Sequence, residues 1–231
     1  IQPGGKPVIG KFIQVLMEPG DCVLYPNPGY PIYESQIDYY GGVAIPYRYI
    51  KDENGFSLDR EFLEDSITKK TKILIYNNYQ NPNGAESSIE EMNWLAGIAI
   101  KHDLWILSDE AYFDIQYNLK SRSITSIPGV KDRTVILFTF SKTYAMTGWR
   151  LGAAIGPVKI IEKINKLNVN NESCSNHFIQ YGGVEAIKGS QEGAKIINNE
   201  LKSRRDLLAE KLNSIEGVKL FLPNSTFYLF P

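Results

Sequence analysis

The chain has 231 residues, 43% of them hydrophobic and 22% charged, so it is long and apolar enough to bury a sizeable core. Its 25 Lys and Arg residues nearly balance 26 Asp and Glu residues, and the net charge of -1 excludes a nucleic acid or an acidic membrane as a partner bound through bulk charge. The two cysteines lack the spacing of a metal or redox motif, and no apolar run could span a bilayer. With no signal peptide visible, we expect a cytoplasmic globular protein without a metal site.

Both ends of the sequence look cut. The chain has no initiator Met and opens at Ile1, directly before a turn and a helix. It closes at Pro231, at the end of an apolar run. We therefore expect a fragment of a longer polypeptide, inactive on its own.

Helical and extended patterns alternate along most of the chain. Apolar residues with helical spacing predict a helix over residues 9–16, which Pro19-Gly20 ends. Ser88 and Glu91 form a capping-box pattern at the start of a later helix. Strands are predicted at residues 22–25, 43–47, 72–76, 104–107, 135–140 and 151–155, and further helices at 31–40, 59–67 and 88–101. This alternation predicts an α/β fold with a mostly parallel sheet and helices on both of its faces.

The C-terminal part has a different pattern. Residues 189–215 predict a long charged amphipathic helix, and residues 218–222 and 227–230 read as strands. We predict a large domain over residues 1–188, with its N-terminal part missing, and the truncated beginning of a smaller α+β domain over residues 189–231.

Polar residues follow three of the predicted strands. Asn81, Asp109 and Lys142 each come after a different strand. In parallel α/β sheets ligands bind beyond the carboxyl ends of the strands, so these side chains are candidates for one shared site.

Each candidate also has a purely structural interpretation. A buried ammonium is costly, and an imine would make Lys142 neutral and reactive, although a surface lysine at a strand exit is the alternative. Asp109 could keep a pyridine nitrogen protonated, or it could cap a helix or form an ion pair. Asn81, held beside Pro82, could donate a hydrogen bond to a phenolate-like oxygen, or simply form a turn.

The segment Gly4-Gly5-Lys6 opens the first predicted helix. Backbone N–H groups at a helix N-terminus make an anion site. Residues 5–12 nearly match a phosphate-binding P-loop, but Phe12 stands where that motif needs a hydroxyl for Mg²⁺. We therefore reject a P-loop.

Together these segments resemble the class I/II aminotransferases, the fold-type I pyridoxal-phosphate enzymes, and in particular their aspartate aminotransferase-like members. The most specific segment, residues 141–150, reads Ser-Lys-Thr-Tyr-Ala-Met-Thr-Gly-Trp-Arg. Four further motifs follow the order of the family: Gly-Gly-Lys at 4–6, Asn-Pro-Gly-Tyr at 27–30, Asn-Pro-Asn-Gly at 81–84 and Asp-Glu-Ala-Tyr at 109–112. The resemblance extends from Gly4 to Phe230.

The resemblance implies a role for each matching residue in binding pyridoxal 5′-phosphate. Lys142 matches the Schiff-base lysine, and Asp109 matches the carboxylate on the pyridine nitrogen. Tyr112 and Asn81 match the groups that hydrogen-bond the 3′ oxygen, and Tyr30 matches the aromatic ring stacked on the cofactor.

The remaining matches concern the phosphate. Gly5 and Lys6 match backbone amides of the phosphate cup. Thr139 and Arg150 match its side-chain ligands, a role that suits the bidentate geometry of arginine.

The implied activity is transfer of the amino group of an L-amino acid to a 2-oxo acid, in a ping-pong cycle with Lys142 moving the protons. Lys142, Asp109 and Tyr112 are then the catalytic residues. The resemblance also implies a homodimer and favours aspartate or a broad range of donors. A C–S β-lyase, an aminocyclopropane-carboxylate synthase or a decarboxylase would use the same cofactor residues. A non-catalytic module that binds the cofactor is disfavoured, because each catalytic position is filled.

Two positions depart from the family pattern. Asn83 replaces the usual Thr, which we expect to be harmless in a turn. Tyr79 replaces the usual Pro, and we expect its larger side chain to reshape the substrate side. The arginine that binds the substrate carboxylate in this family would lie beyond Pro231.

Overall fold

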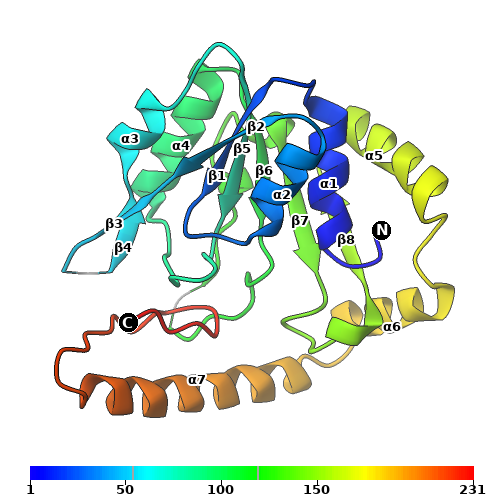
Figure 1. The fold of residues 1–231 in the computed structure, drawn as a ribbon. Coiled ribbons are helices and arrows are strands. Elements are labelled where there is room, and N and C mark those ends of the chain that lie inside the picture. The colour runs from blue at the N-terminus through cyan, green and yellow to red at the C-terminus, as the bar shows by residue number, and fades with distance from the viewer. Residues whose placement is uncertain (54, 119) are drawn as a thin grey trace.

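The fold is built on one six-stranded sheet (Figure 1) in the order β2-β1-β5-β6-β7-β8. The computed structural model describes residues 1–53, 55–118 and 120–231. The strands are β1 (Cys22–Pro26), β2 (Val43–Tyr47), β5 (Thr71–Asn77), β6 (Trp105–Asp109), β7 (Thr134–Thr139) and β8 (Gly152–Ile155). All neighbouring pairs are parallel except β7 and β8. The predicted α/β fold with a mostly parallel sheet is confirmed.

Helices cover both faces of the sheet: α1 (Lys6–Leu16), α2 (Ile32–Tyr39) and α5 (Val158–Asn171) on one face, and α3 (Arg60–Asp65) and α4 (Ile89–Lys101) on the other. Helices α6 (His177–Lys188) and α7 (Glu192–Asn213) follow in the chain. Side chains alternate along β5, so Ile73 and Ile75 pack with α1, α2 and α5, whereas Leu74 and Tyr76 pack with α3 and α4. A continuous apolar strand is thus what a sheet covered on both faces requires.

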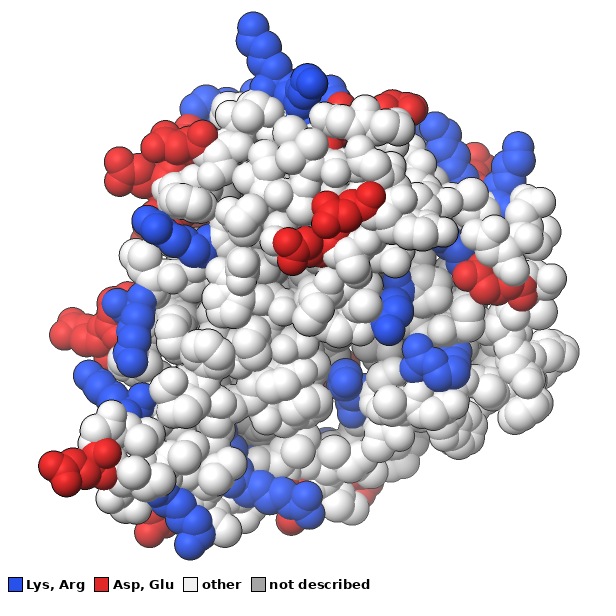
Figure 2. Space-filling model, viewed as in Figure 1, with Lys and Arg blue, Asp and Glu red and all other residues white. Residues whose placement is uncertain are grey.

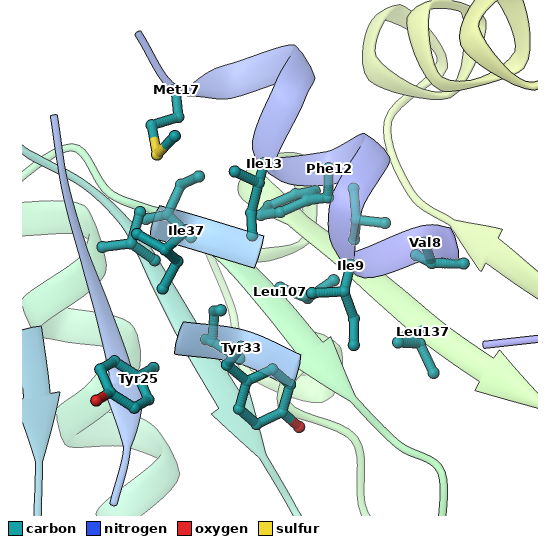
Figure 3. Close-up of a cluster of buried hydrophobic side chains, with 14 of the residues drawn as sticks. Val8, Ile9, Phe12, Ile13, Met17, Tyr25, Tyr33, Ile37, Leu107 and Leu137 are labelled. Atoms are coloured by element: carbon teal, nitrogen blue, oxygen red, sulfur yellow. The ribbon is translucent and has the colours of Figure 1, made fainter. Parts of the chain in front are cut away.

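Helix α1 packs on the three strands that the polar candidate residues follow. It contacts β5, β6 and β7, and in Figure 3 its side chains Ile9 and Phe12 lie toward Leu107 of β6. Across the strand ends, Asn77 pairs with Asp109, and Asp109 pairs with Leu137. The carboxyl ends of β5 and β6 therefore lie level with each other, and β7 extends beyond them to Thr139.

The C-terminal segment differs from the prediction. Helix α7 forms within the predicted range, but residues 218–222 and 227–230 are not strands. Among the described residues, the segment meets another backbone through an isolated bridge between Gln116 and Ser225. The N–H of Leu220 donates instead to the side chain of Asn213. An apolar run becomes a strand only where a partner strand accepts its hydrogen bonds, and in the described part of the chain no such partner strand lies along these residues.

Other differences are local. A hairpin of β3 (Tyr49–Lys51) and β4 (Phe56–Leu58) and helices α5 and α6 form where no element was predicted. The capping box is half formed: Ser88 accepts from the Glu91 N–H, but the Glu91 carboxylate accepts from the Leu58 N–H. Glu91 thereby joins α4 to the hairpin.

Charged side chains of both signs are scattered over the face seen in Figure 2. Among the described residues, no helix is long and apolar enough to cross a membrane, and no group of three or more His, Cys, Asp or Glu side chains could hold a metal ion.

Candidate functional site

A cavity of ≈ 480 Å³ opens beyond the carboxyl ends of β5, β6 and β7. All nine residues singled out in the sequence line it: Gly5, Lys6, Tyr30, Asn81, Asp109, Tyr112, Thr139, Lys142 and Arg150. It is also lined by residues not predicted: Ile9, Tyr33, Asn77, Ala111, Leu137, Ser141, Thr147 and Tyr228. The structure therefore brings the candidates together, and their individual roles stay predictions.

Asp109 is the last residue of β6 and is buried. One carboxylate oxygen accepts a 2.6 Å hydrogen bond from the Tyr33 hydroxyl, and the other accepts from the Ala111 N–H at 3.1 Å. Burial raises the pKa of the Asp109 carboxyl, against the opposing effects of both hydrogen bonds and of the Lys142 charge. A cationic group in the cavity would favour the charged carboxylate.

Lys142 follows β7 and is half-buried. Burial lowers the pKa of its amine; the Asp109 carboxylate opposes this shift and the Arg150 charge adds to it. Its Nζ lies 5.6 Å from the centre of the Tyr112 ring and 5.4 Å from that of Phe227. A lysine with a lowered pKa has more free amine near neutral pH, and is therefore a better nucleophile and base.

Tyr112 and Asn81 supply hydrogen-bonding groups beside Lys142. The Tyr112 hydroxyl lies 2.6 Å from that of Tyr228, and burial, together with this contact, raises the pKa of the Tyr112 phenol. The Asn81 turn is held by Asn77, whose side chain accepts from the Asn81 N–H and donates to the Asp109 carbonyl. Asn81 is thus fixed relative to Asp109.

The opposite end of the cavity can bind an anion. The N-terminus of α1 lies here with Gly5 and Lys6, beside the hydroxyls of Thr139 and Ser141, which are 3.0 Å apart. Arg150 is in the left-handed conformation (φ 55°), and its guanidinium donates to the Thr147 carbonyl at 2.7 Å. This end offers backbone, hydroxyl and guanidinium donors, and charge-assisted bonds from such donors suit a phosphate.

Gly4 permits this arrangement. A Cβ on Gly4 would lie 2.2 Å from Nη2 of Arg150, and its φ of +96° is unfavourable for other residues. The positive φ and this close approach of the guanidinium both favour glycine at position 4.

Sequence reasoning missed several residues of the cavity. Tyr33 could have been found, because it follows Tyr30 by one helical turn, and the two rings pack edge to face at 5.8 Å. Tyr228 offered no local signal, because it comes from a distant segment of the chain. Ser141 lies within the matched motif but was given no role.

Neither of the two departures from the family pattern lines this cavity. Tyr79 is buried against Tyr112, its hydroxyl accepts from the Arg122 N–H, and it is not among the lining residues. Tyr79 therefore reaches the cavity only through lining residues of the same cluster, among them Tyr112 and Tyr228. Asn83 lies in a turn, where its side-chain oxygen accepts from the Ala85 N–H.

Comparison with known proteins identifies a matching family. A family model described as "Aminotransferase class I and II" matches residues 1–231. An aspartate aminotransferase of Musicola paradisiaca is 32% identical over 231 residues, which are 100% of this chain and 58% of that protein. Aromatic-amino-acid aminotransferase 2 of Thermococcus litoralis is 36% identical, over 96% of this chain and 59% of that protein. The chain thus spans about three fifths of the length of these relatives.

Solved structures share the fold. The aromatic aminotransferase from Pyrococcus horikoshii OT3 matches with a TM-score of 0.95 and 32% sequence identity, over 100% of this chain and 62% of that one.

Proposed function

This chain belongs to the class I and II aminotransferase family, as its motifs indicated, and we propose that the natural polypeptide containing it transfers the amino group of an L-amino acid to a 2-oxo acid, with pyridoxal 5′-phosphate as cofactor. One observation carries the proposal: a lysine amine, a buried carboxylate and an anion-binding end line a single cavity.

The donor groups of the cavity fit this cofactor. Arg150, Thr139 and the backbone of Gly5 and Lys6 would hold the phosphate, at the end where glycine lets the guanidinium approach the chain. Asp109 would face the pyridine nitrogen. Burial raises the pKa of this carboxyl because it disfavours the charged form. A protonated ring nitrogen beside Asp109 would stabilise the charged carboxylate.

The other residues would orient the ring. Tyr30 would stack on it, and Tyr112 and Asn81 would donate hydrogen bonds to its 3′ oxygen. When bound, the cofactor supplies an electron sink for the negative charge that develops on the substrate Cα. Lys142 would anchor the cofactor covalently. Its freed Nζ would take the proton from the substrate Cα and deliver it to the aldehyde carbon of the cofactor, so that one residue acts as base and then as acid.

The proposal also covers the identity of the amino acid that donates the amino group. The relatives described above are named for aspartate and for aromatic amino acids. We propose aspartate or a broad set of donors, with a 2-oxo acid as acceptor.

We also propose a large cofactor domain over residues 1–188 and the beginning of a smaller one over residues 189–231. In Figure 1 α7 and the segment after it lie below the sheet, on the side to which the β7 arrow points. The two main core clusters draw their residues from the first region.

We further propose that the protein acts as a homodimer. Helix α6 leaves Phe178, Tyr181, Val184 and Ile187 exposed by 69%, 67%, 50% and 57%. Their spacing places large apolar side chains along the helix, and a second copy would remove them from water. Changing Phe178 and Tyr181 to Glu should lower the mass measured by light scattering to that of one chain; an unchanged mass would contradict this use of α6.

The activity is tested with the natural polypeptide that contains this sequence. Single amino acids are added without acceptor while the visible band of the lysine-bound cofactor is followed. Loss of the band with growth of a pyridoxamine band, reversed by 2-oxoglutarate, would support transamination and identify the donor. Formation of pyruvate and ammonia would indicate a lyase, and absence of any cofactor band would overturn the proposal.

A further inference from the structure

A buried lysine that has no role in the proposed reaction lies behind the anion-binding end. Lys11 is on α1 and is 2% exposed. Its Nζ donates to Gln2 at 2.6 Å, to Asn168 at 3.1 Å and to Glu172 at 2.6 Å. An ammonium has three N–H groups, and these three acceptors can satisfy all of them.

The three acceptors come from two parts of the fold. Asn168 and Glu172 belong to α5 and its C-cap, so their bonds to Lys11 fasten α1 to α5. Gln2 precedes α1 and is also 2% exposed. Burying a lysine and a glutamine is costly, and an apolar pair could fill the same space. The bonds to Asn168 and Glu172 already join α1 to α5, so the bond to Gln2 is not needed for that purpose.

Gln2 connects this cluster to the wall of the cavity. Its backbone N–H donates to the Gly152 carbonyl at 2.8 Å, and its carbonyl accepts from the Gly152 N–H at 3.0 Å. Gly152 follows the arginine of the cavity by two residues, and a Cβ there would lie 2.6 Å from the Gly4 backbone. The Gln2–Gly152 pair thus holds together the two chain segments that carry Gly5 and Arg150.

From this geometry we infer that Lys11 is a positioning residue for the anion-binding end and acts through Gln2. The inference rests on the proposed use of this cavity for pyridoxal 5′-phosphate. Lys11 fixes the Gln2 side chain, Gln2 fixes the backbone of Gly152, and the guanidinium and the α1 N-terminus stay aligned on the phosphate. The ring end of the cavity, around Asp109 and Lys142, is not joined to this cluster by any of these bonds.

The test compares a ligand that has the phosphate with one that lacks it. Dissociation constants for pyridoxal 5′-phosphate and for pyridoxal are measured spectroscopically on the natural polypeptide that contains this sequence. Changing Gln2 to Leu should weaken binding of the phosphate ester about tenfold, which corresponds to about 1.4 kcal/mol, and leave pyridoxal binding nearly unchanged. Changing Gln2 to Glu keeps an acceptor opposite Lys11 and should restore the affinity for the ester.

Asn168 supplies the matched control. Asn168→Leu removes another bond of the same ammonium but leaves the link to Gln2 in place. It should lower the unfolding midpoint without changing the ratio of the two dissociation constants. Lys11→Met should lower both the midpoint and the phosphate preference; where that variant fails to fold, the Gln2 variants alone decide the matter.

The outcomes separate the two levels of inference. If the unmodified protein binds neither ligand, the proposed cofactor is wrong. If it prefers the phosphate ester and Gln2→Leu keeps that preference, the role of Lys11 and Gln2 is wrong while the proposed function stands. If Gln2→Leu weakens the binding of both ligands equally, the cluster only stabilises the fold, and the inference is overturned.

Discussion

Replacing Tyr33 with Phe should raise the pKa of the Asp109 carboxyl further above its ordinary value. The Tyr33 hydroxyl donates to Asp109 at 2.6 Å, both side chains are buried, and the bond stabilises the charged form of the carboxyl. Phe keeps the ring that packs between α2 and the sheet. The substitution therefore removes one donor and little else.

The size of the effect follows from the strength of such a bond. Hydrogen bonds to charged groups contribute about 1.5–3 kcal/mol, and Tyr33→Phe removes this stabilisation of the charged carboxylate, so the pKa of Asp109 should move further upward. A less readily ionised carboxylate would hold a protonated ring nitrogen less well. The affinity for pyridoxal 5′-phosphate should fall as well, because that proposed contact loses charge.

The pKa is measured in the cofactor-free protein by NMR, with ¹³C-labelled Asp and with Asp109→Asn to assign the signal. Tyr30→Phe is the matched control. The Tyr30 ring packs edge to face against Tyr33, but the hydrogen bonds to the Asp109 carboxylate come from Tyr33 and Ala111, not from the Tyr30 hydroxyl. An Asp109 pKa that stays the same or falls in Tyr33→Phe would refute the reasoning that the phenol stabilises the charged carboxylate.

Three further predictions concern Lys142, the pH dependence due to Asp109, and Gly4. Lys142→Ala should abolish transamination and the visible band of the lysine-bound cofactor, whereas Lys101→Ala, at a surface ion pair with Glu64, should retain both; near-normal activity in Lys142→Ala would contradict the proposed mechanism. The folded-state pKa of Asp109 is raised above the ordinary value of 3.8, so the folded protein binds the proton more tightly, and stability contributed by this group is lost as pH rises from 3.8 through the raised pKa. Urea unfolding of the cofactor-free protein across that window should show a smaller decline in Asp109→Asn, and an equal decline would argue against the shift. Gly4→Ala should destabilise the fold by more than about 1 kcal/mol and weaken phosphate binding, because of its positive φ and the contact of a new Cβ with Arg150; unchanged thermal unfolding would show that the loop adapts.

Much of the fold could be predicted from local sequence patterns. The helical period of apolar residues predicts α1, and a short, continuous apolar run rich in β-branched residues predicts a buried strand such as β5. The motif around Lys142 and the order of the other motifs indicated the family, which the comparison confirmed. The same motifs identified nine residues that line one cavity.

Partners between elements could not be predicted in this way. Tyr33 meets Asp109 76 positions away, Tyr228 meets Tyr112 116 positions away, and Lys11 meets Asn168 157 positions away. Such contacts depend on how helices and loops pack on the sheet, and no local period records that packing.

The C-terminal segment also shows that local composition does not decide whether a strand forms. Its apolar residues have the composition of strands, yet the described chain places no strand beside residues 218–222 or 227–230. The sequence by itself determined most of the central helices and strands, the family and the candidate residues, because side-chain period and motif are local properties. Tertiary structure alone decided which groups tune Asp109, support the anion-binding end and cover Lys142, because burial and hydrogen bonding are set by neighbours from distant parts of the chain.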